Sequence, residues 1–344
     1  MKTSKSPKRV MMTAYVTAQR ALPAYAHRFS PKKFTQHQLF ACLVLKEFLK
    51  TDYRGVVGVL ADCPDLCAAI ELDNVPHYTT LQKAADRLLT KNAANRLLDQ
   101  TIVAAVDAKI LKKRSTLTAI DSSGFESHHT SRTFVRRGGK GQNNKQSMTY
   151  RRFPKVGLAC DCASHMILAA VAGRGPTPDH PHVVEVMRAA TARRTIDTLL
   201  ADAGYDAEWV HVFLRDELNI RSIIPPKIGR PTTKLPTGRH RRRMHYYFQR
   251  PKAQRTYGQR WQVETVMSMI KRRLGETLAA RSYRRQCRAI LLKVMAHNVL
   301  ILLGREVFYR ALMTSFAWHA DFGHSRIASG RWPTRRGWHS LSCE

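Results

Sequence analysis

The chain has 344 residues, 44% of them hydrophobic, which is enough to build a core and excludes a disordered tail protein. Its 58 Lys and Arg outnumber its 25 Asp and Glu, giving a net charge of +33. Because a globular protein gains little from such self-repulsion, this charge favours a polyanionic partner. Nucleic acid is the leading expectation, and a ribosomal or membrane-surface role is the alternative.

Neither the cysteines nor the apolar segments indicate a secreted or membrane protein. The seven cysteines are odd in number and none of their spacings matches a zinc site, so reduced and mostly buried thiols are expected. The longest apolar stretch, 289–303, is interrupted by Lys293, His297 and Asn298, so it is not expected to cross a membrane. No signal sequence is recognised, and the expected location is the cytoplasm of a bacterial-type cell, on the nucleoid.

The first third of the chain predicts helices. Residues 1–33 are basic, carry Pro23 and Pro31, and are expected to be irregular. Residues 34–114 predict an all-α domain that precedes the rest of the fold. Its helices are expected at 34–49, which is apolar around its circumference, and at 53–62, 65–72, 79–89 and 92–111.

One of these helices has a sequence signature at its start. Thr79 is followed three residues later by Gln82, which predicts a capping box. Several short helices with a tight turn, in a basic protein, are compatible with a helix-turn-helix whose reading helix lies near 79–90. A plain helical bundle that only packs on the following domain is the alternative, and the sequence leaves both open.

From residue 115 the pattern changes to that of an α/β domain, expected over 115–305. Three short β-prone runs are followed by helix, strand, helix, strand and helix, which predicts a mixed sheet flanked by helices. Strands are expected at 115–125, 150–164, 165–173, 195–206 and 219–227, and helices at 180–194, 207–218 and 256–275. Residues 228–256 are expected to be a basic loop, and the basic tail 306–344 has no sustained period.

Three carboxylates in this domain are candidates for metal binding. Asp121 is expected to end the first strand and Asp202 the fourth, each just after apolar residues (LTAID and TLLAD), and Glu264 follows 62 residues after Asp202 on the last expected helix. Groups at the carboxyl ends of strands meet at one edge of an α/β sheet. Carboxylate oxygens suit Mg²⁺ or Mn²⁺, and two such ions about 3.5–4 Å apart would hold both the attacking and the leaving oxygen of a phosphodiester.

The helix that carries Glu264 has a polar face and an apolar face. At about 100° per residue, Tyr257, Arg260, Glu264 and Lys271 fall within a sector of about 60°. An ordinary solvated face, with Glu264 paired to Arg260 or Lys271, is the alternative to a metal-and-DNA surface. The residues expected to pack on the sheet are Val263, Val266, Ile270 and Leu274.

The spacing Tyr-x2-Arg-x3-Glu-x6-Lys from Tyr257 to Lys271 matches the signature of DDE transposases of the insertion-sequence four and five superfamily. The segments IDSSGF, LLADAGYD and RTYGQRWQVETVMSMIKRRLG are similar to the three catalytic blocks of that family. QHQLFACLVLKEFLKTDYRGVV and HYTTLQKAADRL resemble its helical domain, so the resemblance spans about 34–303.

This resemblance implies an RNase H-like fold and a polynucleotidyl-transfer reaction. Asp121 would lie between two metal ions, with Asp202 holding one and Glu264 the other. Water would first release a 3′-OH at the end of the element, and that 3′-OH would attack target DNA. The implied partners are double-stranded DNA, as terminal repeats and as target, and a second copy of the chain on paired ends.

Residues outside the three acids are expected to contact DNA. Tyr257, Arg260 and Lys271 are candidates for phosphates near the cut. Trp261 is a candidate for stacking on an unpaired base, although packing against the core is the favoured alternative. Lys and Arg also concentrate at 127–160, 239–255 and 272–293, where the named candidates are Arg136, Arg137, Arg242 and Arg243. His128 and His129 are expected to be ordinary loop residues rather than catalytic ones.

Three functions remain compatible with the sequence. The first is an active transposase, and the second is a metal-dependent endonuclease of the same fold that does not join DNA. The third is an inactive remnant that still binds element ends. The intact acids and signature oppose this third reading, and the unusual tail keeps it open.

Overall fold

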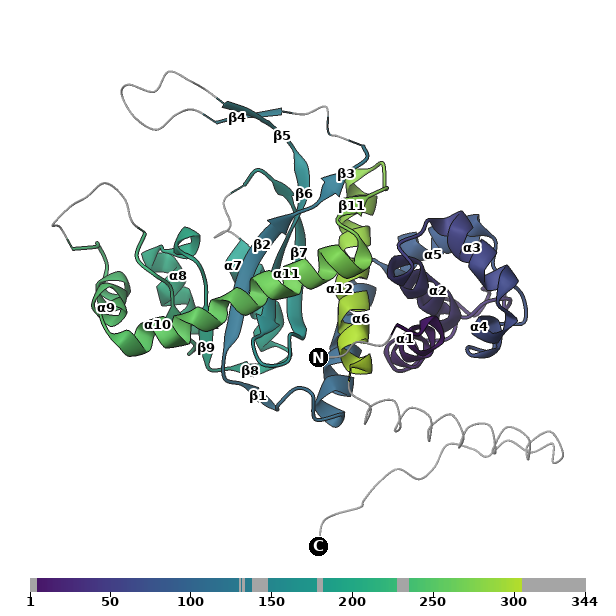
Figure 1. Ribbon diagram of the computed structural model, residues 1–344, viewed down its shortest axis with the longest axis horizontal. Coiled ribbons are helices and arrows are strands. Elements are labelled where there is room, and N and C mark those ends of the chain that lie inside the picture. Colours follow the sequence, from purple (N-terminus) through teal and green to yellow (C-terminus); the bar gives the residue numbers. More distant parts are fainter. Residues whose placement is uncertain are drawn as a thin grey trace, which may run out of the picture. The chain divides into compact units, whose positions relative to one another are not determined.

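The computed structural model describes residues 5–129, 131, 134–137, 148–177, 182–227 and 235–304 (Figure 1). The tail at 306–344 lies outside the described residues. The first part of the chain is helical, as expected. Its helices are α1 (Pro7–Ala21), α2 (Gln36–Phe48), α3 (Tyr53–Asp62), α4 (Pro64–Ala68), α5 (Tyr78–Leu88) and α6 (Lys91–Asp107).

The prediction that residues 1–33 are irregular is wrong over α1. The Ser6 hydroxyl accepts a hydrogen bond from the backbone N–H of Arg9 at 3.4 Å, and Pro7 occupies the first turn, where its missing N–H costs nothing. One apolar face of α1, including Val10 and Met11, is fully buried and packs on α2. This burial stabilises a helix that the basic local sequence does not predict.

The capping box lies on α2 rather than at Thr79. The Thr35 hydroxyl accepts from the N–H of Gln38 at 3.1 Å, and the Gln38 side chain accepts from the N–H of Thr35 at 2.9 Å. Helix α5 begins one residue earlier than expected, at Tyr78, with His77 as its N-cap. The prediction for Thr79 and Gln82 is therefore wrong, because Thr79 is already inside the helix.

A five-stranded mixed sheet with the order β10-β9-β2-β6-β7 forms the centre of the remaining chain. Strand β6 is antiparallel to both of its neighbours, β2 and β7, whereas β9 is parallel to its neighbours β2 and β10. This is the RNase H-like mixed α/β arrangement that was expected. The strands are β2 (Thr118–Gly124), β6 (Phe153–Asp161), β7 (Ile167–Gly175), β9 (Thr198–Leu200) and β10 (Arg221–Ile223).

Helices cover the sheet, with α7 packed on β6 and β7, α11 on β2 and β6, and α12 on β6 and β7 (Figure 1). Small paired strands extend the structure and were not predicted individually. The helical segments are α7 (Val183–Thr191), α8 (Glu208–Val212), the π-helix η3 (Phe213–Glu217), α11 (Trp261–Leu274) and α12 (Tyr283–Leu303). The short strand pairs are β1 (Arg114–Ser115) with β8 (Thr195–Ile196), β3 (Glu126–Ser127) with β11 (Thr277–Leu278), and β4 (Phe134–Arg137) with β5 (Met148–Arg151).

Part of the region 228–256, expected to be a loop, is helical. Helices α9 (Arg239–Phe248) and α10 (Pro251–Tyr257) occupy it, and residues 228–234 lie outside the described residues. The Glu208 carboxylate accepts from the N–H groups of His240 and Arg241 at 2.9 and 3.0 Å. The first turn of α9 is thus capped by an acid from α8, which a local sequence pattern does not reveal.

Helix α12 is long and apolar enough to cross a membrane, but 78% of its apolar window is buried inside the protein. Its polar residues have partners in the core. The Asn298 amide accepts from the N–H of Ile167 at 2.9 Å and donates to its carbonyl at 3.0 Å, and the Lys293 ammonium donates to Glu47 at 2.7 Å. The helix therefore serves as a core element of this fold.

His297 on α12 makes the stability of the protein depend on pH. Its ring Nε2 lies 3.0 Å from the carbonyl oxygen of His165, and burial lowers the pKa of His297 to about 4. Below about pH 6.5 this histidine binds a proton in the unfolded chain but stays neutral in the folded protein, so acid favours the unfolded state. We expect the free energy of unfolding to fall by up to about 3 kcal/mol between pH 7 and pH 4 from this residue alone.

Urea unfolding measured across that pH range checks this expectation. A His297→Gln variant should show a flatter dependence on pH than the original chain. A slope that is the same in both proteins would contradict it. His245→Gln provides the control, because His245 is only partly buried on α9.

Candidate functional site

Asp121 lies in the middle of β2, so the prediction that it ends the strand is wrong. Strand β6 pairs along the whole of β2, from Thr118 to Gly124, and keeps the chain extended past Asp121. On the other side, β9 pairs only with Thr118 and Ala119. Asp121 therefore follows directly after the parallel part of the sheet, where groups from neighbouring strands meet.

Asp202 follows β9 after one residue, as expected. Its side chain accepts from the N–H of Gly204 at 3.0 Å and caps the short 3-10 helix η2 (Ala203–Tyr205). Its backbone carbonyl accepts from the N–H of Tyr205 at 3.1 Å. This turn fixes the carboxylate at the carboxyl end of the parallel strand.

Glu264 lies on a helical run that starts earlier than predicted. Helix α10, the 3-10 turn η4 (Gly258–Arg260) and α11 follow one another without a loop, and Gly275 ends α11 with a positive φ of 86°. The predicted apolar face is confirmed, because its four residues are at most 1% exposed. These are Val263, Val266, Ile270 and Leu274, while Glu264 is exposed on the other side.

Arg260 joins two of the three acids. Its guanidinium donates to the Glu264 carboxylate at 2.5 Å and lies 3.7 Å from the Asp121 carboxylate. Burial opposes its charge, but the hydrogen bond that it donates to Glu264 and the negative charges around it outweigh burial and raise the pKa of Arg260. The Glu264–Arg260 ion pair, which was one of the alternatives for this helix face, is present. The same guanidinium also lies beside the Asp121 carboxylate.

Asp121 and Glu264 line one hollow of about 430 Å³ between β2 and α11, together with Lys271. Asp202 does not line this hollow. Burial raises the pKa of Tyr257, and the negative charges of Asp202 and Glu264 add to the effect, so both carboxylates lie close enough to act on that hydroxyl. The structure thus brings two acids together and places the third nearby.

The donor chemistry of this hollow suits a divalent cation. Two carboxylates are hard oxygen donors, and a cation, the Arg260 guanidinium, already lies between them. No three His, Cys, Asp or Glu side chains among the described residues are close enough to form a ready metal cluster. Asp202 would therefore have to approach the other two before all three could share ions.

Comparison with known families assigns the domain. The family model described as "Transposase DDE domain" matches residues 112–299, more than half of the chain. The chain belongs to the transposase DDE domain family. No protein among the curated sequences matches it significantly. Among solved structures it is similar to a cryo-EM structure of the piggyBac transposase synaptic complex with hairpin DNA, at 10% identity and a TM-score of 0.44, over 94% of this chain and 79% of that one.

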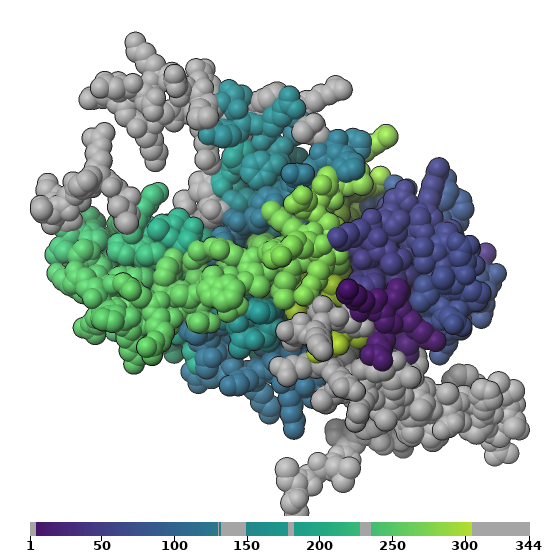
Figure 2. All heavy atoms as spheres, in the orientation of Figure 1, coloured from purple at the N-terminus to yellow at the C-terminus, as the bar shows by residue number. Residues whose placement is uncertain are grey.

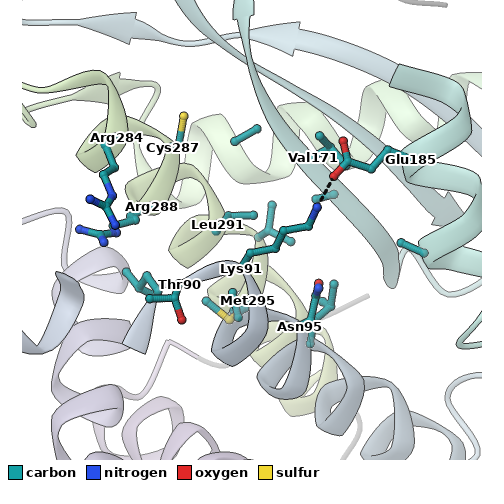
Figure 3. A pocket seen from close by; sticks show the side chains of 17 residues that line it. Thr90, Lys91, Asn95, Val171, Glu185, Arg284, Cys287, Arg288, Leu291 and Met295 are labelled. Carbon is teal, nitrogen blue, oxygen red and sulfur yellow. Dashed lines mark hydrogen bonds and ion pairs between the residues drawn. The ribbon is translucent and has the colours of Figure 1, made fainter. Parts of the chain in front are cut away.

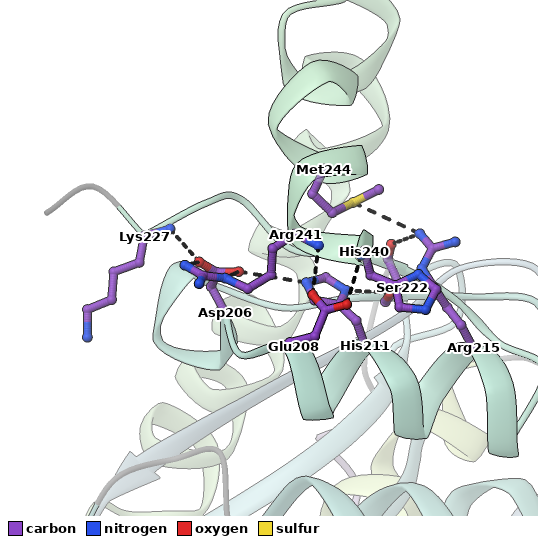
Figure 4. A network of polar contacts seen from close by, with 9 residues as sticks. All are labelled: Asp206, Glu208, His211, Arg215, Ser222, Lys227, His240, Arg241 and Met244. Atoms are coloured by element: carbon purple, nitrogen blue, oxygen red, sulfur yellow. Dashed lines mark hydrogen bonds and ion pairs between the residues drawn. The ribbon is translucent and has the colours of Figure 1, made fainter. Parts of the chain in front are cut away.

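A buried network holds the Asp202 turn of this DDE domain against α9 (Figure 4). Asp206, four residues after Asp202, has a fully buried carboxylate that receives two hydrogen bonds from Arg241, at 3.0 and 2.7 Å. The backbone N–H of Lys227 donates to it at 2.8 Å, and His211 Nε2 lies 3.7 Å away. Burial alone would raise the pKa of Asp206, but these contacts outweigh burial and hold it well below its usual value.

No local pattern in the sequence predicted this network. Asp206 belongs to the GYD of the second catalytic block, but Arg241 was counted within a basic cluster assigned to DNA. Phe248 at the end of α9 packs on Tyr257, with ring centroids 5.2 Å apart. Through α9, the network therefore connects the Asp202 turn with the helical run α10–η4–α11, which carries Arg260 and Glu264.

We expect Asp206→Asn to lower the free energy of unfolding by about 2 kcal/mol, because it leaves a largely buried Arg241 without its counter-charge. The loss is smaller than for a fully buried pair because Arg241 keeps some contact with water. Urea unfolding measures it. Asp216→Asn, which removes a half-exposed acid from the same region, should change stability by less than about 0.5 kcal/mol, and equal losses would refute the assignment.

The other predicted DNA contacts of the DDE domain have varied surroundings. Trp261 is 54% exposed, so the expectation that it packs in the core is wrong. Arg242 and Arg243 are exposed on α9. The side chains of Arg136 and Arg137 on β4 lie outside the described residues, and those of His128 and His129 do not line the hollow of Asp121.

A separate cavity of about 440 Å³ lies between α6, α7, α12 and β7 and shares no lining residue with the hollow of the acids (Figure 3). Its walls are mainly apolar, and the Lys91–Glu185 ion pair at 2.7 Å lies across it.

Figure 2 shows α10 and α11 exposed along one face of the molecule. The candidate site therefore lies at β2 and α11 and not in the apolar cavity.

Proposed function

We propose that this chain is a DNA transposase of the insertion-sequence four and five superfamily, which cuts and joins DNA at Asp121, Asp202 and Glu264. The observation that carries the proposal is the position of the Arg260 guanidinium, which lies between the carboxylates of Asp121 and Glu264 in a domain of the transposase DDE family. The signature spacing from Tyr257 to Lys271 supports the superfamily assignment.

The three acids would hold one or two Mg²⁺ or Mn²⁺ ions, which supply charge neutralisation and activate water or a 3′-OH when bound. The chain itself contributes positive charge around the reacting phosphodiester. Lys271 lines the same hollow as Asp121, and its ammonium lies 5.7 Å from the centre of the Phe125 ring. Arg260 neutralises the acids in the absence of metal ions. Once the acids bind metal ions, its guanidinium is placed to contact phosphate oxygens.

The exposed cations fit a partner of double-stranded DNA. Two exposed arginines, Arg242 and Arg243, lie on α9. The exposed ring of Trp261 lies at the start of α11, the helix that carries Glu264. Lys83 and Arg87 are exposed one turn apart on α5, the candidate reading helix. Binding of element ends by two copies of the chain, on the nucleoid, completes the proposal.

Replacing Arg260 with Ala tests the role of this cation. Without the guanidinium, the affinity of the site for Mn²⁺ should rise roughly fivefold, because a competing positive charge is gone. Metal-dependent DNA cleavage should fall by about 100-fold, because a phosphate-facing charge is also lost. Isothermal titration with Mn²⁺ measures the first effect, and Arg255→Ala, on exposed α10 surface, is the matched control. An unchanged Mn²⁺ affinity would count against a metal at this position.

The function itself is tested by cleavage and joining of labelled terminal DNA, taken from the sequence that flanks this reading frame, with Mg²⁺, Mn²⁺ or EDTA. Metal-dependent nicking followed by strand transfer supports the transposase. Nicking without transfer favours the endonuclease. Binding without any cutting favours an inactive end-binding remnant.

A further inference from the structure

A second, larger hollow adjoins that of the acids. It has a volume of about 880 Å³, within the range of about 300–1,000 Å³ found for ligand sites. Lys271 lines both hollows, and Gly124, which lines the second, directly follows Ser123, which lines the first. A strand of DNA that passes the acids would therefore meet this second hollow next.

The lining of the second hollow is strongly basic. Among the residues that the structure describes, it contains five cationic side chains and one carboxylate, that of Glu126. Gln286 fixes part of the wall, since its amide donates to the Ser127 hydroxyl at 2.8 Å and to the Ala280 carbonyl at 3.0 Å. Such an excess of positive charge suits phosphate groups. The five cations are Arg151, Arg152, Arg174, Lys271 and Arg281.

Flat aromatic surfaces accompany these charges. The Phe153 ring lies across Gly124 and Gly175, where a Cβ atom would come within 2.7 and 2.3 Å of it, and the Phe153 side chain is 38% exposed. The Arg174 guanidinium lies 3.9 Å from the centre of the Tyr283 ring. Both surfaces line the hollow, so it offers planar groups as well as cations.

We propose that this hollow binds one unpaired nucleotide of the DNA strand whose phosphodiester lies at the acids. The cations hold its phosphates, and its base stacks on the Phe153 ring or on the Arg174–Tyr283 pair. A base inside a duplex has both faces covered by its neighbours, so planar groups in a hollow favour an unpaired one. This inference rests on the proposed function, and it adds the kind of DNA and the side chains that hold it.

The test uses the full chain, in EDTA, with a 20-nucleotide oligo-dT strand that carries one 2-aminopurine, and with a 20-base-pair duplex. The double variant Phe153→Ala/Arg174→Ala should weaken binding of the single strand about tenfold and duplex binding by less than threefold. It should also abolish the quenching of 2-aminopurine fluorescence that stacking causes. Phe29→Ala and Arg28→Ala remove an equivalent exposed arginine–aromatic pair, 4.5 Å apart, and should change neither.

The double variant Phe153→Leu/Arg174→Lys keeps apolar contact and charge without the planar groups, and thermal unfolding confirms that each variant is folded. Its single-strand affinity should resemble that of the double Ala variant. Equal losses for single strand and duplex, or quenching that persists without Phe153 and Arg174, would overturn the proposal. Asp121→Asn separates it from the proposed function, because that variant should keep the quenching even if no form of the chain cleaves DNA.

Discussion

Asp121→Asn is expected to reduce metal-dependent cleavage of terminal DNA on the order of 10³-fold, while DNA affinity stays within about twofold. Asp121 lies on β2 just beyond the part that is parallel to β9, and it faces Glu264 across the Arg260 guanidinium. An amide of the same size keeps the strand intact but removes the charge that binds a cation. Single-turnover cleavage in Mg²⁺ and Mn²⁺ measures the effect.

Glu276→Gln is the matched control for this experiment. Glu276 is an exposed acid that lines the same hollow at the end of α11, but it lies outside the signature. Its loss should change cleavage less than about threefold, whereas Glu264→Gln should resemble Asp121→Asn. If Glu276→Gln abolished cleavage and Glu264→Gln did not, the wrong glutamate would have been assigned.

Glu47→Ala is expected to lower the free energy of unfolding by about 3–5 kcal/mol. Glu47 on α2 and Lys293 on α12 are paired at 2.7 Å, and their side chains are only 5% and 6% exposed. Lys46 also pairs with Glu47, at 2.5 Å. Removing the carboxylate leaves two mostly buried ammonium groups without their counter-charge, and urea unfolding at pH 7 measures the loss.

Two comparisons sharpen this prediction. Glu185→Ala, which breaks an exposed ion pair with Lys91, should cost less than about 1 kcal/mol. Glu47→Leu combined with Lys293→Met should cost less than the sum of the two single changes, because no uncompensated pair member remains. Additive losses would show that the two side chains do not stabilise each other.

The pH dependence of this pair has a defined sign. Burial would raise the pKa of Glu47, but the charges of Lys46 and Lys293 outweigh it and lower that pKa below 4.5. A carboxylate with a lowered pKa contributes stability above its unfolded pKa and loses it as pH falls through the folded value. The cost of Glu47→Ala should therefore shrink below about pH 4.

Periodic patterns in the sequence predicted the elements that carry the acids. The apolar face of α11 recurs at helical spacing, and β6 and β7 read as two apolar runs with a turn between them. Trp261 was placed wrongly, although it lies about 200° around the helix from Val263 and therefore away from the buried face. That angle was available in the sequence and favours the exposure that the structure shows.

Features made by distant partners were not predictable from local patterns. Helix α9 depends on Glu208, about 30 residues earlier in the chain, and Asp206 meets Arg241 across a similar separation. Neither pairing leaves a periodic signal in the sequence. The central position of Asp121 in β2 likewise follows from the long pairing with β6, which no residue near Asp121 encodes.

The ammonium of Lys293 has a consequence for how this protein can be divided. It binds Glu47 on α2 and also the carbonyl of Leu274, the last residue of the helix that carries Glu264. The helices before residue 115 and the sheet belong to one compact unit. A shortened chain without those helices would expose the apolar side of α12 and leave a buried cation unmatched. The DDE sheet is therefore not a module that could be transplanted or expressed without the helices that precede it.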